Sequence, residues 1–291
     1  MRTIFVTGSR GHTGSVLIEN LVSEAESGAE MKIVAGVTAT PKQSRNFDHV
    51  ETRVCNYGNE QQLYQALEGV DAAYLMVPFG RDMIEWGRQF VAAAVMQKVK
   101  FIVRLSGLGA SADSLSAMGR LHGTIDEIVR DSGIDYCVLR CNSFMQNFTG
   151  MYRQMVMRGK LALAHGDAKI SFIDTSDIAA VAAKALANPD FYSGKTLDLH
   201  GPQRLSNKDV VDVIGRITDS EIENIILSAE RVRESYRRAK FGAWEQDVFC
   251  SLDRYFRYGY AEGDPAQLEK ALGRGAMDFE TFAELNKSIW V

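Results

Sequence analysis

The chain has 291 residues, of which 46% are hydrophobic and 24% are charged, a composition typical of a globular protein with a sizeable core. Its formal net charge of −4 excludes a strongly basic surface and argues against a nucleic-acid partner, because phosphate binding needs clustered lysines and arginines. The densest basic run, Arg231 to Lys240, is interleaved with glutamates and is interpreted as a solvated helix face. With no leader-like segment and no apolar stretch of roughly 18 residues, we expect a cytoplasmic protein that does not enter a membrane.

Four scattered cysteines predict reduced thiols and no metal centre. They are Cys55, Cys137, Cys141 and Cys250. Cys137 and Cys141 lie in one strand-like run, which would separate them by about 13 Å at roughly 3.3 Å per residue. That distance is too long for a disulfide or a shared metal ion.

The first half of the chain alternates short apolar runs with helical patterns. The predicted strands are Thr3–Thr7, Lys32–Val37, Glu51–Cys55, Ala72–Val77, Phe101–Leu105 and Tyr136–Arg140. The predicted helices between them are Gly14–Ala25, Glu60–Ala66, Met83–Gln97 and Leu121–Asp131. This order predicts an α/β fold in which a doubly wound parallel Rossmann sheet is covered by helices on both faces.

The pattern changes after residue 142 and predicts a smaller C-terminal substrate lobe. Predicted helices are Phe148–Arg158, Ser176–Ala187, Asn207–Thr218, Ala229–Ala239 and Phe279–Asn286, and predicted strands are Ile170–Ile173 and Thr196–His200. We expect residues 1–149, joined by 170–200, to form a dinucleotide-binding core. Residues 150–169 and 201–291 are expected to form the lobe.

Three glycines, Gly8, Gly11 and Gly14, follow the first predicted strand in the run VTGSRGHTG. A strand, a glycine-rich turn and a helix can hold a pyrophosphate, because backbone N–H groups and the helix dipole point at the anion. The GxxGxxG spacing differs from the usual GxGxxG, and a purely structural turn is the alternative interpretation. The place of the turn on the first strand of an alternating series favours a dinucleotide.

The end of the second predicted strand favours NADP over NAD. A Rossmann site for NAD usually has an acidic residue there that binds the ribose hydroxyls, but residues 37–42 read VTATPK. A carboxylate would repel a 2′-phosphate, whereas Thr38, Lys42 and Arg10 are polar or basic. The alternative is that Lys42 is only a solvated loop residue.

Further segments resemble a known family. They are LEGVDAAYLMVP (67–78), KFIVRLSGLGA (100–110), HGTIDEIVRDSGIDYCVLRCNSFMQNF (122–148) and FIDTSDIAAVAAKAL (172–186). In this order they are similar to the NmrA-like group of atypical short-chain dehydrogenase/reductases. LEKALGRGAMDFETFAEL (268–285) resembles the closing helices of that group's bacterial reductases, which include NADPH-dependent triphenylmethane, quinone and azo reductases.

The resemblance implies where each part of the cofactor would lie. Around the pyrophosphate it places Gly8, Ser9, Arg10, Gly11, His12, Thr13 and Gly14. Along the adenosine and its ribose it places Met76, Val77 and Pro78, near the nicotinamide ribose Ser106 and Gly107, and beside the nicotinamide Asn142, Ser143 and Phe144.

The chain also departs from the family at two places. Thr38 stands where many members have an arginine, while Lys42 matches a basic residue that some members use for the 2′-phosphate. Members often carry a Gly-Asp pair whose Asp meets the adenine amino group, and here the pair is Cys55-Asn56. The Asn56 amide oxygen can still accept that hydrogen bond.

The helix after the fifth predicted strand lacks the usual catalytic pair. Most short-chain dehydrogenases use Tyr-x-x-x-Lys to protonate an alkoxide, but residues 121–127 read LHGTIDE. A quinone, iminium or azo acceptor needs a proton less urgently than a ketone, because delocalisation stabilises its reduced form. We therefore predict a small, electron-poor, conjugated acceptor. His122 is a candidate proton donor, and a structural histidine at the helix start is the alternative.

Aromatic and thioether side chains after the sixth predicted strand suggest a substrate pocket. Its predicted walls are Phe144, Met145, Phe148 and Tyr152, with core packing as the alternative for each. Trp244, in a predicted Gly-Ala-Trp loop, is expected to close the pocket. Asp174 and Asp177 are interpreted as structural caps at a helix start.

These observations predict an NADPH-dependent reductase of small conjugated acceptors, as a monomer or homodimer. A non-catalytic NADP(H) sensor that binds a partner protein fits the missing pair equally well. An isomerase or epimerase with tightly held NAD is the third alternative, although that chemistry normally uses the pair. The segment from Arg231 to Tyr260, with its charged and aromatic residues, resembles substrate-lobe helices and favours the enzyme.

Overall fold

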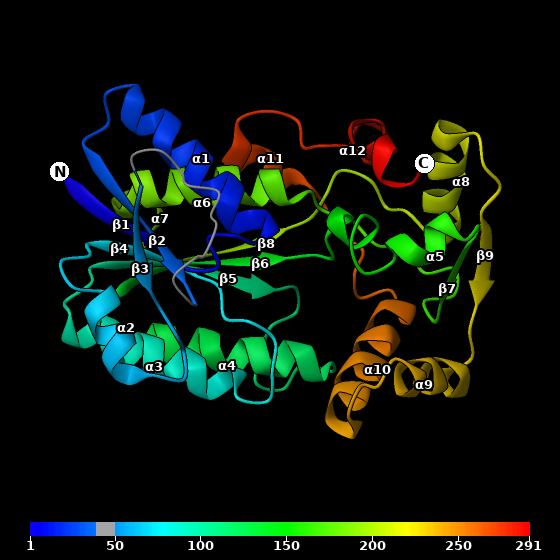
Figure 1. Ribbon diagram of the computed structural model, residues 1–291, viewed down its shortest axis with the longest axis horizontal. Coiled ribbons are helices and arrows are strands. Elements are labelled where there is room, and N and C mark those ends of the chain that lie inside the picture. The colour runs from blue at the N-terminus through cyan, green and yellow to red at the C-terminus, as the bar shows by residue number, and fades with distance from the viewer. Residues whose placement is uncertain (39–49) are drawn as a thin grey trace. The chain divides into compact units, whose positions relative to one another are not determined.

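The structure is a computed structural model that describes residues 1–38 and 50–291 (Figure 1). Its contacts divide the chain into two compact units. Unit 1 comprises Met1–Ser106, Leu121–Arg140 and Ile178–Leu197, and unit 2 comprises Gly107–Arg120, Cys141–Asp177 and Asp198–Val291. The functional division at residues 149, 170 and 200 remains a prediction.

A seven-stranded sheet has the order β3-β2-β1-β4-β5-β6-β8. Its strands are β1 (Arg2–Val6), β2 (Met31–Val37), β3 (Glu51–Val54), β4 (Ala72–Leu75), β5 (Phe101–Gly107), β6 (Asp135–Cys141) and β8 (Lys195–Leu199). The pairs β1–β2, β1–β4, β2–β3 and β4–β5 are parallel. All four residues of β4 are buried, as expected for a strand covered on both faces. The predicted doubly wound α/β fold is confirmed.

Helices cover both faces of this sheet. They are α1 (His12–Glu26), α2 (Glu60–Ala66), α3 (Met83–Met96), α4 (Ala117–Asp131), α6 (Thr175–Ala187) and α7 (Pro189–Tyr192). Figure 1 shows α1 and α6 on one face and α2, α3 and α4 on the other. On the second face, Phe90 of α3 and Ile125 of α4 are fully buried with Ile102 of β5 in one apolar cluster.

Unit 2 contains mainly short elements. They are η1 (Met145–Asn147), α5 (Arg153–Met157), β7 (Lys160–Leu163), α8 (Asn207–Thr218), β9 (Glu223–Ile226), α9 (Ala229–Arg238), α10 (Ala243–Arg257), α11 (Ala266–Leu272), α12 (Phe279–Asn286) and η2 (Lys287–Ile289). Strands β7 and β9 form a separate parallel pair. The core gathers around Phe148, whose ring contacts those of Phe172 and Phe279. The Trp290 indole N–H donates to the Phe148 carbonyl at 2.9 Å.

Two predicted elements of unit 2 are wrong. Of the helix predicted over Phe148–Arg158 only α5 (Arg153–Met157) forms, because residues 148–152 make a turn in which the Gly150 N–H donates to the Gln146 carbonyl. The strand predicted over Ile170–Ile173 makes only single bridges, to Leu205 at one end and to Phe144 at the other. Its apolar residues Ile170, Phe172 and Ile173 are buried, so the apolar pattern of this segment reflects core packing and not a hydrogen-bonded ladder of a sheet.

A buried polar cluster joins three parts of unit 2. The Asp253 carboxylate of α10 accepts from the Tyr236 hydroxyl of α9 at 2.8 Å and lies 3.2 Å from Nε2 of His165. The Asn207 side-chain nitrogen at the start of α8 lies 3.4 Å from the other His165 ring nitrogen. Burial, with the Asp253 charge adding to it, raises the pKa of Tyr236, so the phenol stays protonated and donates.

In the described part of the chain, none of the helices has the length and apolar character needed to cross a bilayer.

Candidate nucleotide-binding site

The turn between β1 and α1 is held in place by Thr7. Its hydroxyl donates to the Tyr74 carbonyl at 2.9 Å and accepts from the Met76 N–H at 2.7 Å. These bonds fasten the end of β1 to the end of β4. The next residue, Gly8, has a φ of +58°, which a glycine adopts at little cost.

Two further glycines of this turn differ in how tightly they are packed. A Cβ atom at Gly14 would lie 2.2 Å from the Gly8 carbonyl oxygen, a separation that real Cβ atoms do not reach. A Cβ atom at Gly11 would lie 3.3 Å from the same oxygen. Gly14 therefore lets α1 approach the turn, whereas Gly11 is exposed and a Cβ atom there would need only a small shift of the Gly8 carbonyl.

The N-terminus of α1 is free of side-chain caps. Its N-cap is Gly11, which makes no side-chain cap bond, and the first turn of the helix contains no acidic residue. The positive end of this 15-residue helix is thus available to an anion. Three of the predicted pyrophosphate ligands, His12, Thr13 and Gly14, form this first turn.

A hollow of about 180 Å³ lies at the carboxyl ends of β1 to β4, the edge where doubly wound sheets bind ligands. It is lined by Thr7, Gly8, Ser9, Arg10, Gly11, Gly36, Val37, Thr38, Cys55, Tyr57, Met76 and Pro78. Predicted site residues from the glycine turn, the end of β2 and the end of β4 therefore meet here. Lys42 lies outside the described residues.

Five lining residues were not predicted as part of the site: Thr7, Gly36, Val37, Cys55 and Tyr57. Burial raises the pKa of the Cys55 thiol to about 12, so it is neutral at physiological pH. The Tyr57 hydroxyl donates to the Met76 carbonyl at 2.5 Å, and burial raises its pKa as well. These groups give the hollow an uncharged wall that suits a heterocyclic base better than an ion.

The structure places three further residues of the predicted site: Ser9, predicted for the pyrophosphate, and Val77 and Asn56, predicted for the adenosine. Ser9 is buried, and its hydroxyl donates to the Gly36 carbonyl at 2.7 Å, which ties the turn to β2. Val77 is buried, and its two neighbours in the sequence, Met76 and Pro78, line the hollow. Asn56 is exposed, and its amide oxygen already accepts from the Gly58 N–H at 3.1 Å, which leaves one lone pair for a further donor.

His122 belongs to a buried polar cluster of unit 1. An Nη atom of Arg104, a fully buried side chain on β5, lies 3.1 Å from the His122 Nδ1 atom. The Arg104 Nε atom lies 3.7 Å from the Asp126 carboxylate, which accepts from the Ser106 hydroxyl at 2.8 Å. Arg140 of β6 lies 3.6 Å from the same carboxylate.

The environment of His122 keeps its ring neutral. Burial, together with the Arg104 charge, lowers the pKa of His122 to about 3. The ring also lies inside α4, which begins at Ala117, so the alternative of a histidine at the helix start is wrong. Burial raises the pKa of Asp126, and the two arginines oppose that effect.

The predicted nicotinamide and substrate residues other than Ser106 lie in unit 2. The buried Asn142 amide donates to the Ala261 carbonyl at 2.8 Å and accepts from the Ser143 N–H at 2.7 Å. Gly107, Ser143 and Phe144 are partly exposed.

Two of the predicted pocket walls are part of the core. Met145 and Phe148 are essentially fully buried, so they pack in the core, which was the alternative to a role as pocket walls. Tyr152 is partly exposed and contacts the Phe148 ring, with centroids 5.6 Å apart. Trp244 is also partly exposed, but it lies in the first turn of α10 and not in a loop, because the extended Gly242 is already the N-cap.

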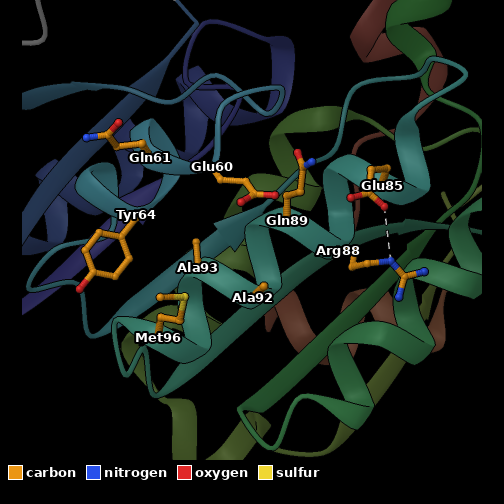
Figure 2. A pocket seen from close by; sticks show the side chains of 9 residues that line it. All are labelled: Glu60, Gln61, Tyr64, Glu85, Arg88, Gln89, Ala92, Ala93 and Met96. Atoms are coloured by element: carbon orange, nitrogen blue, oxygen red, sulfur yellow. Dashed lines mark ion pairs between the residues drawn. The ribbon is translucent and has the colours of Figure 1, made fainter.

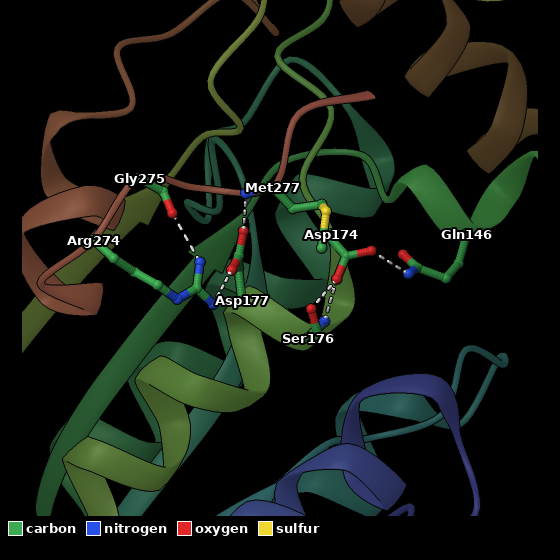
Figure 3. Close-up of polar contacts among 7 residues, drawn as sticks. All are labelled: Gln146, Asp174, Ser176, Asp177, Arg274, Gly275 and Met277. Atoms are coloured by element: carbon green, nitrogen blue, oxygen red, sulfur yellow. Dashed lines mark hydrogen bonds and ion pairs between the residues drawn. The ribbon is translucent and has the colours of Figure 1, made fainter. Parts of the chain in front are cut away.

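The start of α6 is stabilised by two carboxylates of unit 2 (Figure 3). Asp174 accepts from the Ser176 N–H at 2.7 Å, as a helix cap does, and from the Gln146 amide at 2.6 Å. Asp177 accepts from the Arg274 guanidinium and from the Met277 N–H, both at 2.7 Å. Both aspartates are therefore structural, and the second one holds the segment after α11.

A larger hollow of about 440 Å³ lies between α2 and α3 (Figure 2). Tyr64 and Met96 give it an apolar part, and Glu60 and Glu85 place two carboxylates on its rim. Glu85 is paired there with Arg88 at 3.5 Å, and none of the residues lining this hollow belongs to the predicted site. The smaller hollow at the strand ends is therefore the better candidate for a nucleotide.

Within residues 1–38 and 50–291, the structure shows no group of three or more histidine, cysteine, aspartate or glutamate side chains able to hold a metal ion.

Comparison with known proteins extends these observations. The NmrA-like family matches the chain over residues 1–246. An NAD(P)H azoreductase of Xenophilus azovorans is 27% identical over 282 residues, which cover 97% of this chain and 96% of that protein. Agroclavine dehydrogenase of Claviceps fusiformis is 28% identical over 297 residues and 99% of each chain.

Among solved structures, the NADPH-dependent quinone oxidoreductase QOR2 of Escherichia coli, complexed with NADPH, has the same fold. Its TM-score is 0.85 at 24% identity, and the match covers 97% of this chain and 99% of that one.

Proposed function

The chain belongs to the NmrA-like family, and on that premise we propose that it is an NADPH-dependent reductase of small conjugated acceptors. The observation that carries the proposal is the N-terminus of α1, whose N-cap Gly11 makes no side-chain hydrogen bond, beside a hollow at the carboxyl ends of β1 to β4 that is lined by Arg10 and by uncharged residues. Together they offer a place for a pyrophosphate and for an adenosine. The curated relatives named above, an azoreductase and a dehydrogenase, support a redox role.

NADPH is proposed over NADH because of the charges near the end of β2. Among the described residues that line the hollow, Arg10 is the charged one, and no carboxylate stands beside it. Thr38 is exposed at the end of β2 and adds a hydroxyl. Arg10 and Lys42 are therefore proposed to bind the 2′-phosphate.

Substitution at Lys42 and Arg10 tests this preference. A charge-assisted contact to a phosphate is worth roughly 1.5–3 kcal/mol, so Lys42→Ala should weaken NADPH binding about ten- to a hundredfold and leave NADH nearly unchanged. Lys42→Glu should make the affinities for NADPH and NADH nearly equal. The loss of NADPH affinity in Arg10→Ala measures how much Arg10 contributes to binding the 2′-phosphate. Calorimetric titration with both cofactors measures the effect. Equal affinities in the unsubstituted protein would show that the 2′-phosphate is not recognised.

A conjugated acceptor is proposed because α4 offers no strong proton donor. The helix contains His122, which is neutral at physiological pH, and no Tyr-x-x-x-Lys pair. A bound NADPH would supply the hydride, a conjugated acceptor could spread the resulting charge, and the proton would then come from water and need no acidic side chain. Positioning beside the nicotinamide would provide most of the rate. The residues assigned above to the nicotinamide and the acceptor remain predictions.

A panel of acceptors tests the proposed activity. Purified protein is mixed with NADPH and, separately, with a quinone, an azo dye, a triarylmethane dye and a cyclic iminium. Loss of the reduced nicotinamide absorbance with at least one acceptor is expected, and the Gly11→Val variant serves as the inactive control. Tight NADPH binding without oxidation by any acceptor would contradict the reductase and favour the NADP(H) sensor, which the fold alone does not separate from an enzyme.

A further inference from the structure

Resting on the proposed reductase activity, we propose that Arg104 holds His122 as a neutral imidazole with its proton on Nε2, which donates a hydrogen bond to the acceptor as hydride arrives. In this role His122 never gives up its proton. Arg104 is a positioning residue that acts through the ring.

The tautomer follows from the chemistry of the contact. A guanidinium has only donors, so the Arg104 nitrogen 3.1 Å from Nδ1 must donate to it. Nδ1 is then the lone-pair nitrogen of the ring, and a neutral imidazole must carry its proton on Nε2. Within the described part of the chain Nε2 makes no hydrogen bond, and the side chain is partly exposed. Nε2 therefore remains available to a ligand.

The surrounding charge keeps the ring in this state. Arg104 and Arg140 bring two positive charges to the cluster, and both lie within 3.7 Å of the same carboxylate, that of Asp126. A third positive charge on His122 would be repelled, and no carboxylate contacts the ring to offset that repulsion in the described residues. The usual catalytic histidine donates its Nδ1–H to a carboxylate and becomes a base. Here Nδ1 instead accepts a hydrogen bond from the cationic Arg104.

The hydrogen bond from Arg104 to Nδ1 makes the Nε2–H group of His122 a better donor. Donation from a cation to Nδ1 withdraws electron density from the ring, and hydrogen bonds in a chain strengthen one another. A neutral imidazole used as an electrophile is a known enzymatic device. Negative charge that hydride transfer places on an acceptor oxygen or nitrogen would be stabilised by this donor and by the excess positive charge behind it.

Nitrogen NMR of the ring tests the tautomer without any acceptor. The protein is labelled with ¹⁵N-histidine, and the His122 signals are assigned by their loss in His122→Gln. A lone-pair Nδ1 and a protonated Nε2 are expected between pH 5 and pH 8. Titration of the ring near pH 6.5, or a proton on Nδ1, would overturn the proposal even if the reductase is active.

Kinetics test the donor. With an acceptor from the panel that accepts charge on oxygen or nitrogen, His122→Phe should lower kcat about a hundredfold, while His122→Gln, which keeps an N–H donor, should restore most of it. KM for NADPH should not change. Glu127→Gln, an exposed change on the same helix, is the matched control. An equal loss of kcat in His122→Phe and His122→Gln would show that His122 contributes only packing and no hydrogen bond to the acceptor.

Arg104→Met tests the positioning residue. Without the cation, the pKa of His122 should rise and kcat should become dependent on pH, whereas Arg104→Lys, which keeps a positive donor, should preserve the flat profile. A flat profile in a folded Arg104→Met variant would contradict the role of Arg104. Absence of NADPH oxidation in the unsubstituted protein would instead refute the proposed function and leave the NMR result standing.

Discussion

Gly11→Val should abolish NADPH binding while the protein stays folded. Gly11 is exposed and has an extended backbone at φ −78°, which valine adopts, and a Cβ atom there would press only slightly on the Gly8 carbonyl oxygen at 3.3 Å, so we expect a loss of folding free energy of about 1–2 kcal/mol. The branched side chain would instead occupy the space at the start of α1 that the pyrophosphate needs. Calorimetric titration and thermal unfolding measure the two effects separately.

Gly14→Ala is the matched comparison in the same turn. Its Cβ would lie 2.2 Å from the Gly8 carbonyl oxygen, so the backbone of the turn must move and both stability and NADPH affinity should fall. Wild-type affinity in Gly11→Val would mean that the nucleotide lies elsewhere. Equal destabilisation by the two changes would mean that Gly11 is needed for packing and not for a ligand.

Asp253→Ala should lower the free energy of unfolding of unit 2 by about 3–5 kcal/mol. The carboxylate accepts from the Tyr236 hydroxyl and faces His165 Nε2, and both partners would lose a buried acceptor. Asp247→Ala on the same helix is the control, because its ion pair with Arg233 is exposed and should contribute less than about 1 kcal/mol. Urea unfolding measures both variants. Similar losses would show that the buried cluster adds nothing beyond a surface pair.

Helix bounds could be predicted well where a cap is encoded next to them. The predicted bounds of α2, α8 and α12 agree with the structure. Their N-caps Asn59, Ser206 and Asp278 each accept from a backbone N–H of the first turn, which is a local signal. Strands β7 and β9 were missed because each has four residues and they pair only with one another across a long stretch of chain.

The candidate site was predictable to the extent that it is local in sequence. The glycine turn and the start of α1 follow one strand directly, so their spacing could be interpreted from the sequence. Cys55 and Tyr57 reach the hollow only because β3 pairs with β2. Arg104 carried no signal within an apolar strand, since its partners His122 and Asp126 come from α4. The neutral state of His122 depends on those tertiary contacts.

The indole of Trp290, whose N–H bonds the Phe148 carbonyl, has a consequence for synthesis on the ribosome. Unit 1 takes its last segment from Ile178–Leu197, so it can close once those residues have left the exit tunnel. Unit 2 packs Trp290 into the same core as Phe148 and Phe279, and that core stays incomplete until residue 290 has left the exit tunnel. During translation, therefore, a folded glycine turn would coexist with an unfinished second unit, which is the stage at which the nascent chain most needs protection by chaperones.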